Sequence, residues 1–150
     1  MSFKGTGLLA LEQYFSASQA TAHKLGHGIG MAYAELEVGL SPIGVGSHNL
    51  GLTLPAGAIL LFAFVDVETV PTSGGAATLA IQVGSTDIVA AAAISGVPWS
   101  TTGLKAGVQD NTVANAHKSS SDEDVKAVVA VDSLTAGKVK VYLHYHYPSP

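Results

Sequence analysis

Two pairs of histidines have the spacing at which imidazole rings bind metal ions in proteins. His23 and His27 lie four residues apart, so on a helix their side chains would share one face. His144 and His146 alternate with tyrosines, so on a strand they would project from one face. Either site needs a further ligand, and the neighbouring sequence does not supply one. We therefore predict that the chain holds no metal and no other cofactor.

Paired carboxylates could act as a general acid and a general base. Glu35 with Glu37, and Asp66 with Glu68, are each two residues apart, which puts both members of a pair on one face of a strand. Apolar residues alternate with them, as is typical of the outward side of a half-buried strand. The acidic residues 122–124 lack the glycine and alternating oxygen ligands of a calcium loop. We interpret all of these carboxylates as solvated.

Motifs for nucleophilic catalysis and phosphate binding are missing. The sequence has no cysteine and no G-x-S-x-G elbow, and the glycines of residues 44–46 lack the Lys-Ser/Thr of a phosphate loop. Trp99 could be a stacking platform for a sugar. A single tryptophan beside Pro98 is, however, more typical of a loop anchored on the core. We predict that the protein is not an enzyme.

Strands are the elements that would position these residues. From Met31 onward, short segments of alternating or apolar residues are separated by turn residues at intervals of about 8–12 residues. This pattern favours an all-β domain over 31–150, an antiparallel β-sandwich or jelly roll of about seven or eight strands. We predict strands over residues 32–38, 47–54, 58–70, 77–85, 87–95, 125–133 and 138–147, and a further edge strand over 113–116.

Alternation also assigns residues to the faces of these strands. In 138–147, one face carries the lysines with Tyr142, His144 and His146, which we group with Trp99 as a candidate oligomer or ligand surface. The apolar run 59–65 predicts burial on both faces. We expect turns and loops over most of 96–125, and a turn over 134–137.

The N-terminal segment differs from the rest of the chain. Residues 8–25 have a helix-compatible composition but fit helical spacing poorly, and the glycine-rich GHGIG segment follows them. We predict that residues 1–30 form an N-terminal arm or short helix. Its apolar side chains would need a surface to cover them: Leu8, Leu9, Leu11, Tyr14 and Phe15.

Composition narrows the choice of partner. The 150 residues are 47% hydrophobic but only 12% charged, about half the usual share of ~25%. All seven basic residues are lysine and the net charge is −4, which argues against a nucleic-acid partner. The uncharged stretch 38–65 contains Pro, Ser, Asn and His, so we expect no membrane span, and we expect no signal peptide. A soluble domain with so few charges buries much of both sheet faces or covers surface with a partner.

Residues 54–147 carry a recognisable order of strands and turns. The order is LPAGA, an apolar strand ending in VDV, a TSGG turn, ATLAIQVG, VAAAAI, a G-x-P-W loop, and the closing LTAGKVKVY strand. This order resembles the capsid decoration, or cement, proteins of tailed bacteriophages. The resemblance implies a β-sandwich on the outside of a capsid, often as a trimer, which binds the major capsid protein.

The resemblance implies a non-enzymatic virion structural protein that is made in the host bacterial cytoplasm and placed on the capsid exterior. The arm would then anchor it to the capsid. Two alternatives remain at this point. One is a carbohydrate-binding head or tail fibre domain that uses Trp99, Tyr142 and the histidines. The other is a metal-dependent β-barrel enzyme that uses His144 and His146.

Overall fold

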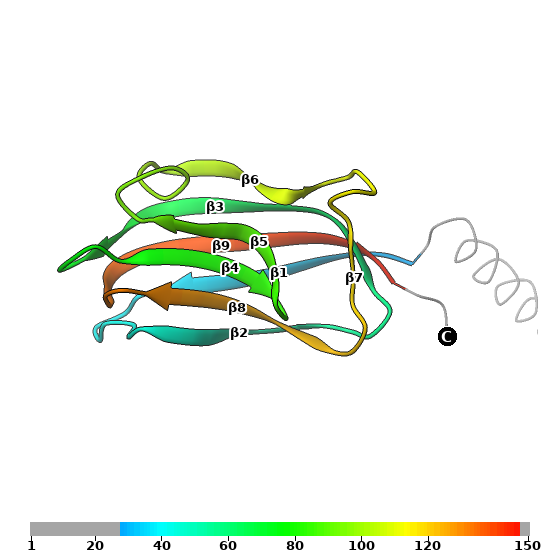
Figure 1. Ribbon diagram of the computed structural model, residues 1–150, viewed down its shortest axis with the longest axis horizontal. Helices are drawn as coiled ribbons and strands as arrows, with labels where there is room; N and C mark the ends of the chain where they lie inside the picture. The colour runs from blue at the N-terminus through cyan, green and yellow to red at the C-terminus, as the bar shows by residue number, and fades with distance from the viewer. Residues whose placement is uncertain (1–27, 148–150) are drawn as a thin grey trace, which may run out of the picture.

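The computed structural model describes residues 28–147, and these residues form nine strands without a helix (Figure 1). In chain order they are β1 (Ile29–Glu37), β2 (Gly46–Leu54), β3 (Ile59–Ser73), β4 (Thr78–Val83), β5 (Thr86–Ala93), β6 (Gly103–Asp110), β7 (His117–Lys118), β8 (Glu123–Ala130) and β9 (Leu134–His146).

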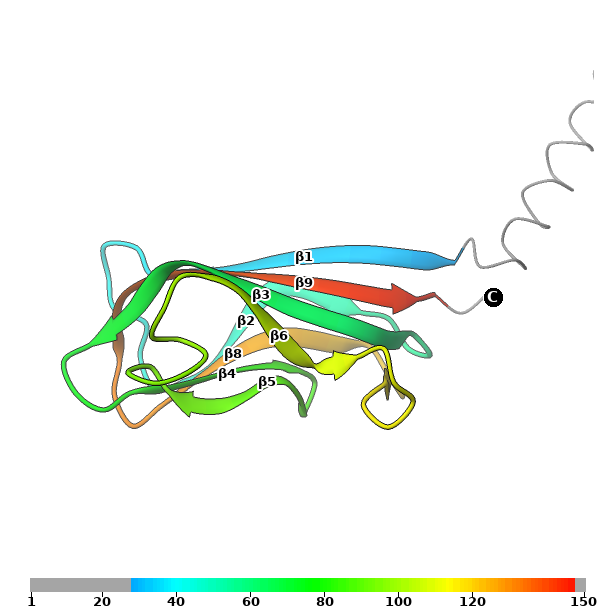
Figure 2. The ribbon, with the colours of Figure 1, turned by 90° about the horizontal axis from the view of Figure 1, so that it is seen from above.

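The strands form two antiparallel sheets that stack face to face (Figure 2). Sheet A has the order β1-β9-β3-β6, with the short β7 paired to β3, and sheet B has the order β2-β8-β4-β5. Apart from the β4–β5 hairpin and the β6–β7 step, each strand is followed by one in the other sheet. This double-sheet order is that of a jelly roll, so the predicted all-β sandwich or jelly roll is confirmed.

The sequence-based assignment of strands and turns was wrong in three segments. The structure has β6 where loops were expected, because its sequence GLKAGVQD combines two glycines with polar residues, as turns do. Residues 134–137, predicted as a turn, begin β9. The edge strand predicted over 113–116 is instead a turn, in which the backbone N–H groups of Asn115 and Ala116 both donate to the carbonyl of Thr112.

The predicted two-sided burial of residues 59–65 was also wrong. Leu60, Ala63 and Val65 are fully buried between the sheets, whereas Phe62 and Phe64 lie on the outer face of sheet A. The register between β3 and β9 shifts between Leu60 and Phe62, which accounts for the break in simple alternation. Sheet A therefore has a buried inner face and an exposed outer face.

The core fills the space between the inner faces of the two sheets. In β9, Val139, Val141 and Leu143 point into it, as the alternation predicted, and their neighbours point outward. Burying each such side chain contributes roughly 1.5–3 kcal/mol. The largest fully buried side chain is Trp99, from the loop between β5 and β6.

Strand β1 begins at Ile29, so its first two residues fall within the segment 1–30 that the sequence assigned to the arm. Gly30 fits within β1 because the Tyr145 ring lies where a larger residue would place its Cβ, 2.5 Å from Cζ. The glycine-rich pattern had suggested a hinge there. The predicted arm residues Leu8, Leu9, Leu11, Tyr14 and Phe15, and the pair His23 and His27, lie outside the described residues.

Candidate functional site on the outer face of sheet A

An aromatic cluster crosses three strands of sheet A on its outer face. Strand register brings its members together: Tyr33 in β1 lies opposite Tyr142 in β9, which lies opposite Phe64 in β3. One step along, His144 lies opposite Phe62. We call these five residues the aromatic cluster.

The rings of the aromatic cluster contact one another in a continuous series. Phe64 stacks on Tyr142, with ring centroids 4.8 Å apart and an interplanar angle of 14°. Tyr33 packs tilted against the other side of this pair, 5.5 Å from Tyr142. Phe62 continues the series, 5.7 Å from Phe64, and meets the His144 ring edge-on at 6.0 Å. These distances lie in the range at which aromatic pairs attract, so the cluster is a preorganised surface.

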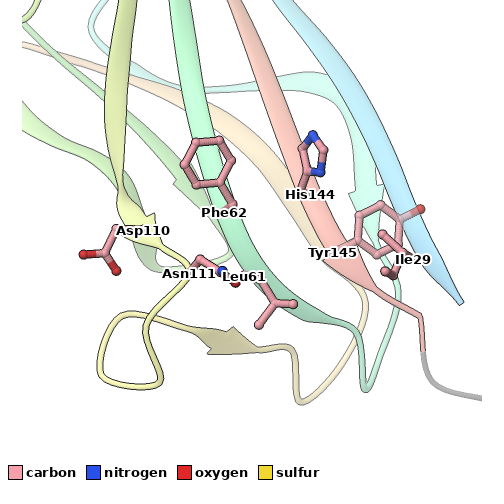
Figure 3. Close-up of a pocket in the computed structure, with 7 residues that line it drawn as sticks. All are labelled: Ile29, Leu61, Phe62, Asp110, Asn111, His144 and Tyr145. Atoms are coloured by element: carbon pink, nitrogen blue, oxygen red, sulfur yellow. The ribbon is translucent and has the colours of Figure 1, made fainter. Parts of the chain in front are cut away.

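Exposed aliphatic side chains extend the aromatic cluster on both sides. Met31 in β1 is 74% exposed and Leu104 in β6 is 69% exposed. The surface is hollowed at two places next to the phenylalanines of the aromatic cluster. One hollow of about 320 Å³ lies between β3 and β6, and a second of about 420 Å³ lies beside Phe62 and His144 (Figure 3). A contiguous apolar surface of this kind, on a chain with few charges, is typical of a protein interaction site.

Charged residues occupy the other half of the same face. Lys138 lies among three carboxylates, with its Nζ 3.3 Å from Glu35, 3.6 Å from Glu37 and 3.7 Å from Glu68. Lys140 pairs with Glu68 as well. Together with Asp66, four carboxylates and two ammonium groups give this band a formal charge of −2. The outer face is thus apolar at one end and acidic at the other.

One hydrogen bond joins the two halves of the face. The Tyr33 hydroxyl donates to the Glu35 carboxylate. This bond raises the pKa of Tyr33, and it lowers the pKa of Glu35. The hydrogen bond from Lys138 to Glu35 raises the pKa of that lysine, and Glu68 does the same for Lys140. These shifts favour the usual charge states at neutral pH: a neutral Tyr33, an ionised Glu35, and protonated Lys138 and Lys140.

The structure separates the four residues that the sequence grouped as a candidate surface. Tyr142 and His144 belong to the aromatic cluster, and His146 lies at the end of the same face, opposite Ile29 and Ile59. Trp99 does not belong there. It is 0% exposed, and its indole Nε1 donates to the carbonyl of Leu79 at 2.9 Å. It is the loop anchor that its position beside Pro98 favoured.

Sequence reasoning missed Tyr33, Phe62 and Phe64. The sequence did indicate their position. Phe62 and Phe64 lie four and two residues before Asp66, so in a regular strand they share its face, which was assigned to solvent. Tyr33 likewise lies two residues before Glu35 in β1, and therefore on the same face of the strand. The unbroken apolar run around the phenylalanines concealed this alternation.

Residues 28–147 contain no group of three or more His, Asp or Glu side chains placed to hold a metal ion. The nearest approach to a catalytic arrangement is at the β7 end. His117 lies 3.1 Å from the Thr86 hydroxyl through Nδ1 and 2.5 Å from the Glu123 carboxylate through Nε2. These three residues join β7 to β5 and β8 of sheet B. The described part of the chain also contains no helix long and apolar enough to cross a membrane.

The jelly-roll fold has counterparts among solved structures. No family model and no curated protein matches the sequence. The fold is similar to a chain of the acidic stable capsid structure of Helicobacter pylori bacteriophage KHP30, with a TM-score of 0.57 and 17% identity over 81% of this chain and 89% of that chain.

Two further phage capsid structures contain similar chains. One is from the capsid of Ralstonia phage GP4, with a TM-score of 0.57 and 18% identity over 81% of this chain and 86% of that one. The other is from the capsid asymmetric unit of cyanophage Pam1, with a TM-score of 0.54 and 18% identity over 80% of this chain and 85% of that one. At these identities the likeness establishes the fold, which three phage capsids share.

Proposed function

We propose that this chain is a non-catalytic structural protein of a bacteriophage virion that binds the outer surface of the capsid and stabilises it, as a decoration or cement protein. The observation that carries the proposal is the exposed apolar half of the outer face of sheet A, on a fold shared with chains of three phage capsid structures. Fold alone does not define function, so the exposed face is the necessary second support.

The proposed partner is the major capsid protein. Burying several exposed apolar side chains against a capsid surface contributes binding energy, and repetition over a symmetric shell adds avidity. In this proposal the chain forms a homo-oligomer, a trimer by the family resemblance. Residues 1–30, with Leu8, Leu9, Leu11, Tyr14 and Phe15, anchor it to the shell.

The two alternative functions have less support. A carbohydrate-binding domain would lose its best stacking residue, because Trp99 is buried in the core. A metal-dependent enzyme would need a further ligand beside His144 and His146, and His144 instead packs against Phe62. No observation on the described residues favours either alternative over the structural role.

Binding to empty capsid shells tests the proposal. Shells are assembled from the major capsid protein of the same genome, mixed with the purified full chain and sedimented. We expect saturable co-sedimentation, weakened by Leu104→Ser on the outer face of sheet A. The control is Val113→Ser, which removes an even more exposed aliphatic side chain (96% exposed) from the loop after β6. Failure of the unaltered chain to bind shells overturns the proposed function.

A further inference from the structure

The two sheets of the sandwich have edges at β1, β6, β2 and β5, and three of them are irregular. In β2 the register against β8 breaks between Asn49 and Thr53. The register of β5 against β4 shifts twice, and the register of β6 against β3 shifts once. Bulges of this kind are a common way in which proteins prevent an edge strand from pairing with another chain.

Among residues 28–147, nothing protects the β1 edge in this way. Nine consecutive residues pair with β9 without a shift, from Ile29 opposite His146 to Glu37 opposite Lys138. The strand contains no proline, no lysine and no inward-pointing charge, and its inward residues are Gly30, Ala32, Ala34 and Leu36. Within the described residues, β9 is its sole strand partner. A long and regular edge of this kind is a template for an added strand.

The hydrogen-bond pattern identifies which backbone groups of β1 have no strand partner among residues 28–147. Tyr147 N–H donates to the carbonyl of Gly28, and Val38 N–H donates to that of Gly137 at 3.0 Å. Gly28 and Val38, which flank β1, are both even-numbered. In an antiparallel pair, residues that are hydrogen-bonded to the partner strand alternate with residues that are not. The even residues of β1 therefore face β9, and the odd ones, including Met31, turn their N–H and C=O groups to the open edge.

The odd residues also carry the outward side chains, so a strand added there would lie beside them. It would pass Ile29, Met31 and Tyr33 at one end and Glu35 and Glu37 at the other. A second β1 fits this pattern poorly. Parallel pairing would place glutamates beside glutamates, and two-fold antiparallel pairing about Tyr33 would place both glutamates opposite Met31 and Ile29.

We infer that the free edge of β1 receives an extended segment of a different protein, which adds a strand to sheet A. The segment has apolar residues opposite Ile29, Met31 and Tyr33 and Lys or Arg opposite Glu35 and Glu37. Main-chain hydrogen bonds supply affinity, and the side chains supply specificity. The inference rests on the proposed function in assigning that segment to the major capsid protein.

A matched pair of variants tests the free edge. Met31→Pro and Met31→Ala both remove an exposed side chain, but only proline removes the edge-facing N–H, and it leaves the ladder to β9 intact. Binding to capsid shells is measured for both variants and for the unaltered chain, with thermal unfolding to verify folding. We expect Met31→Ala to bind within a few-fold of the unaltered chain and Met31→Pro to bind about tenfold more weakly or worse.

Hydrogen exchange on the unaltered chain gives a second readout that does not depend on how the variants fold. The backbone amides of Met31, Tyr33 and Glu35 should become protected when the chain binds shells. Equal binding by Met31→Pro and Met31→Ala, or no gain in protection over 29–37, overturns the edge inference while the proposed function stands. If the unaltered chain does not bind shells at all, the proposed function and the assigned partner both fail.

Discussion

At the scale of single residues, Trp99 connects the β5–β6 loop to sheet B. Its indole N–H donates to the Leu79 carbonyl, where the register of β4 against β5 shifts. Trp99→Phe would leave that buried carbonyl without its indole donor, and it should lower the free energy of unfolding by about 1–3 kcal/mol. Denaturant unfolding measures the change.

Tyr142→Phe provides the control for this prediction, because it removes one hydroxyl from the outer face. It should change the free energy of unfolding by no more than about 0.5 kcal/mol. An equal effect of the two substitutions would contradict the anchoring role of the indole.

The bond between Tyr33 and Glu35 makes a pH-dependent prediction. The raised pKa of Tyr33 stabilises the fold below the ordinary tyrosine pKa of about 10, and this contribution is lost as the pH rises through the folded-state pKa. The lowered pKa of Glu35 stabilises the fold above about 4.3, and this contribution is lost as the pH falls through its folded-state pKa. We expect Glu35→Gln to lower the pKa of Tyr33 in an NMR titration. An unchanged Tyr33 pKa would show that the hydrogen bond does not form in solution.

At the scale of elements, β6 closes one side of the sandwich through Gly107. A Cβ at this position would lie 2.8 Å from the Ala63 carbonyl oxygen in β3 and 3.0 Å from that of Ile88 in β5. Both neighbours are backbone atoms that cannot rotate away. Gly107→Ala should therefore lower the free energy of unfolding by about 1–3 kcal/mol, measured by denaturant unfolding.

Gly39→Ala is the matched control, because nothing lies within 4 Å of a Cβ built at Gly39. It should be neutral or slightly stabilising, since alanine reduces the freedom of the unfolded chain. If both alanine variants unfold at the same denaturant concentration, Gly107 does not lie as close to β3 and β5 as the structure shows.

Sequence alone predicted the elements whose local pattern is strong. The alternation of β9 assigned Val139, Val141 and Leu143 to the core and Tyr142 to the outer face. The aromatic cluster, by contrast, depends on pairing between strands far apart in sequence, such as β1 with β9. No local pattern specifies such pairing. The β6 strand was missed because its stability comes from packing against β3, and not from its own glycine-rich composition.

At the scale of the whole molecule, the few charges and the large apolar face favour association. We expect the purified chain to sediment as a homo-oligomer, with a trimer as the expected state, at micromolar concentration. A monomer at high micromolar concentration would contradict this expectation. Because the β1 edge disfavours self-pairing, Met31→Pro should leave the sedimentation coefficient unchanged.

In the proposed function, the chain binds the outside of a phage capsid and stabilises it. The most direct measurement is the thermal unfolding temperature of capsid shells with and without saturating chain, combined with cryo-electron microscopy of the same shells. We expect ordered density for the chain on the outer surface and a higher unfolding temperature for decorated shells. Shells that remain bare and unfold at the same temperature would contradict it.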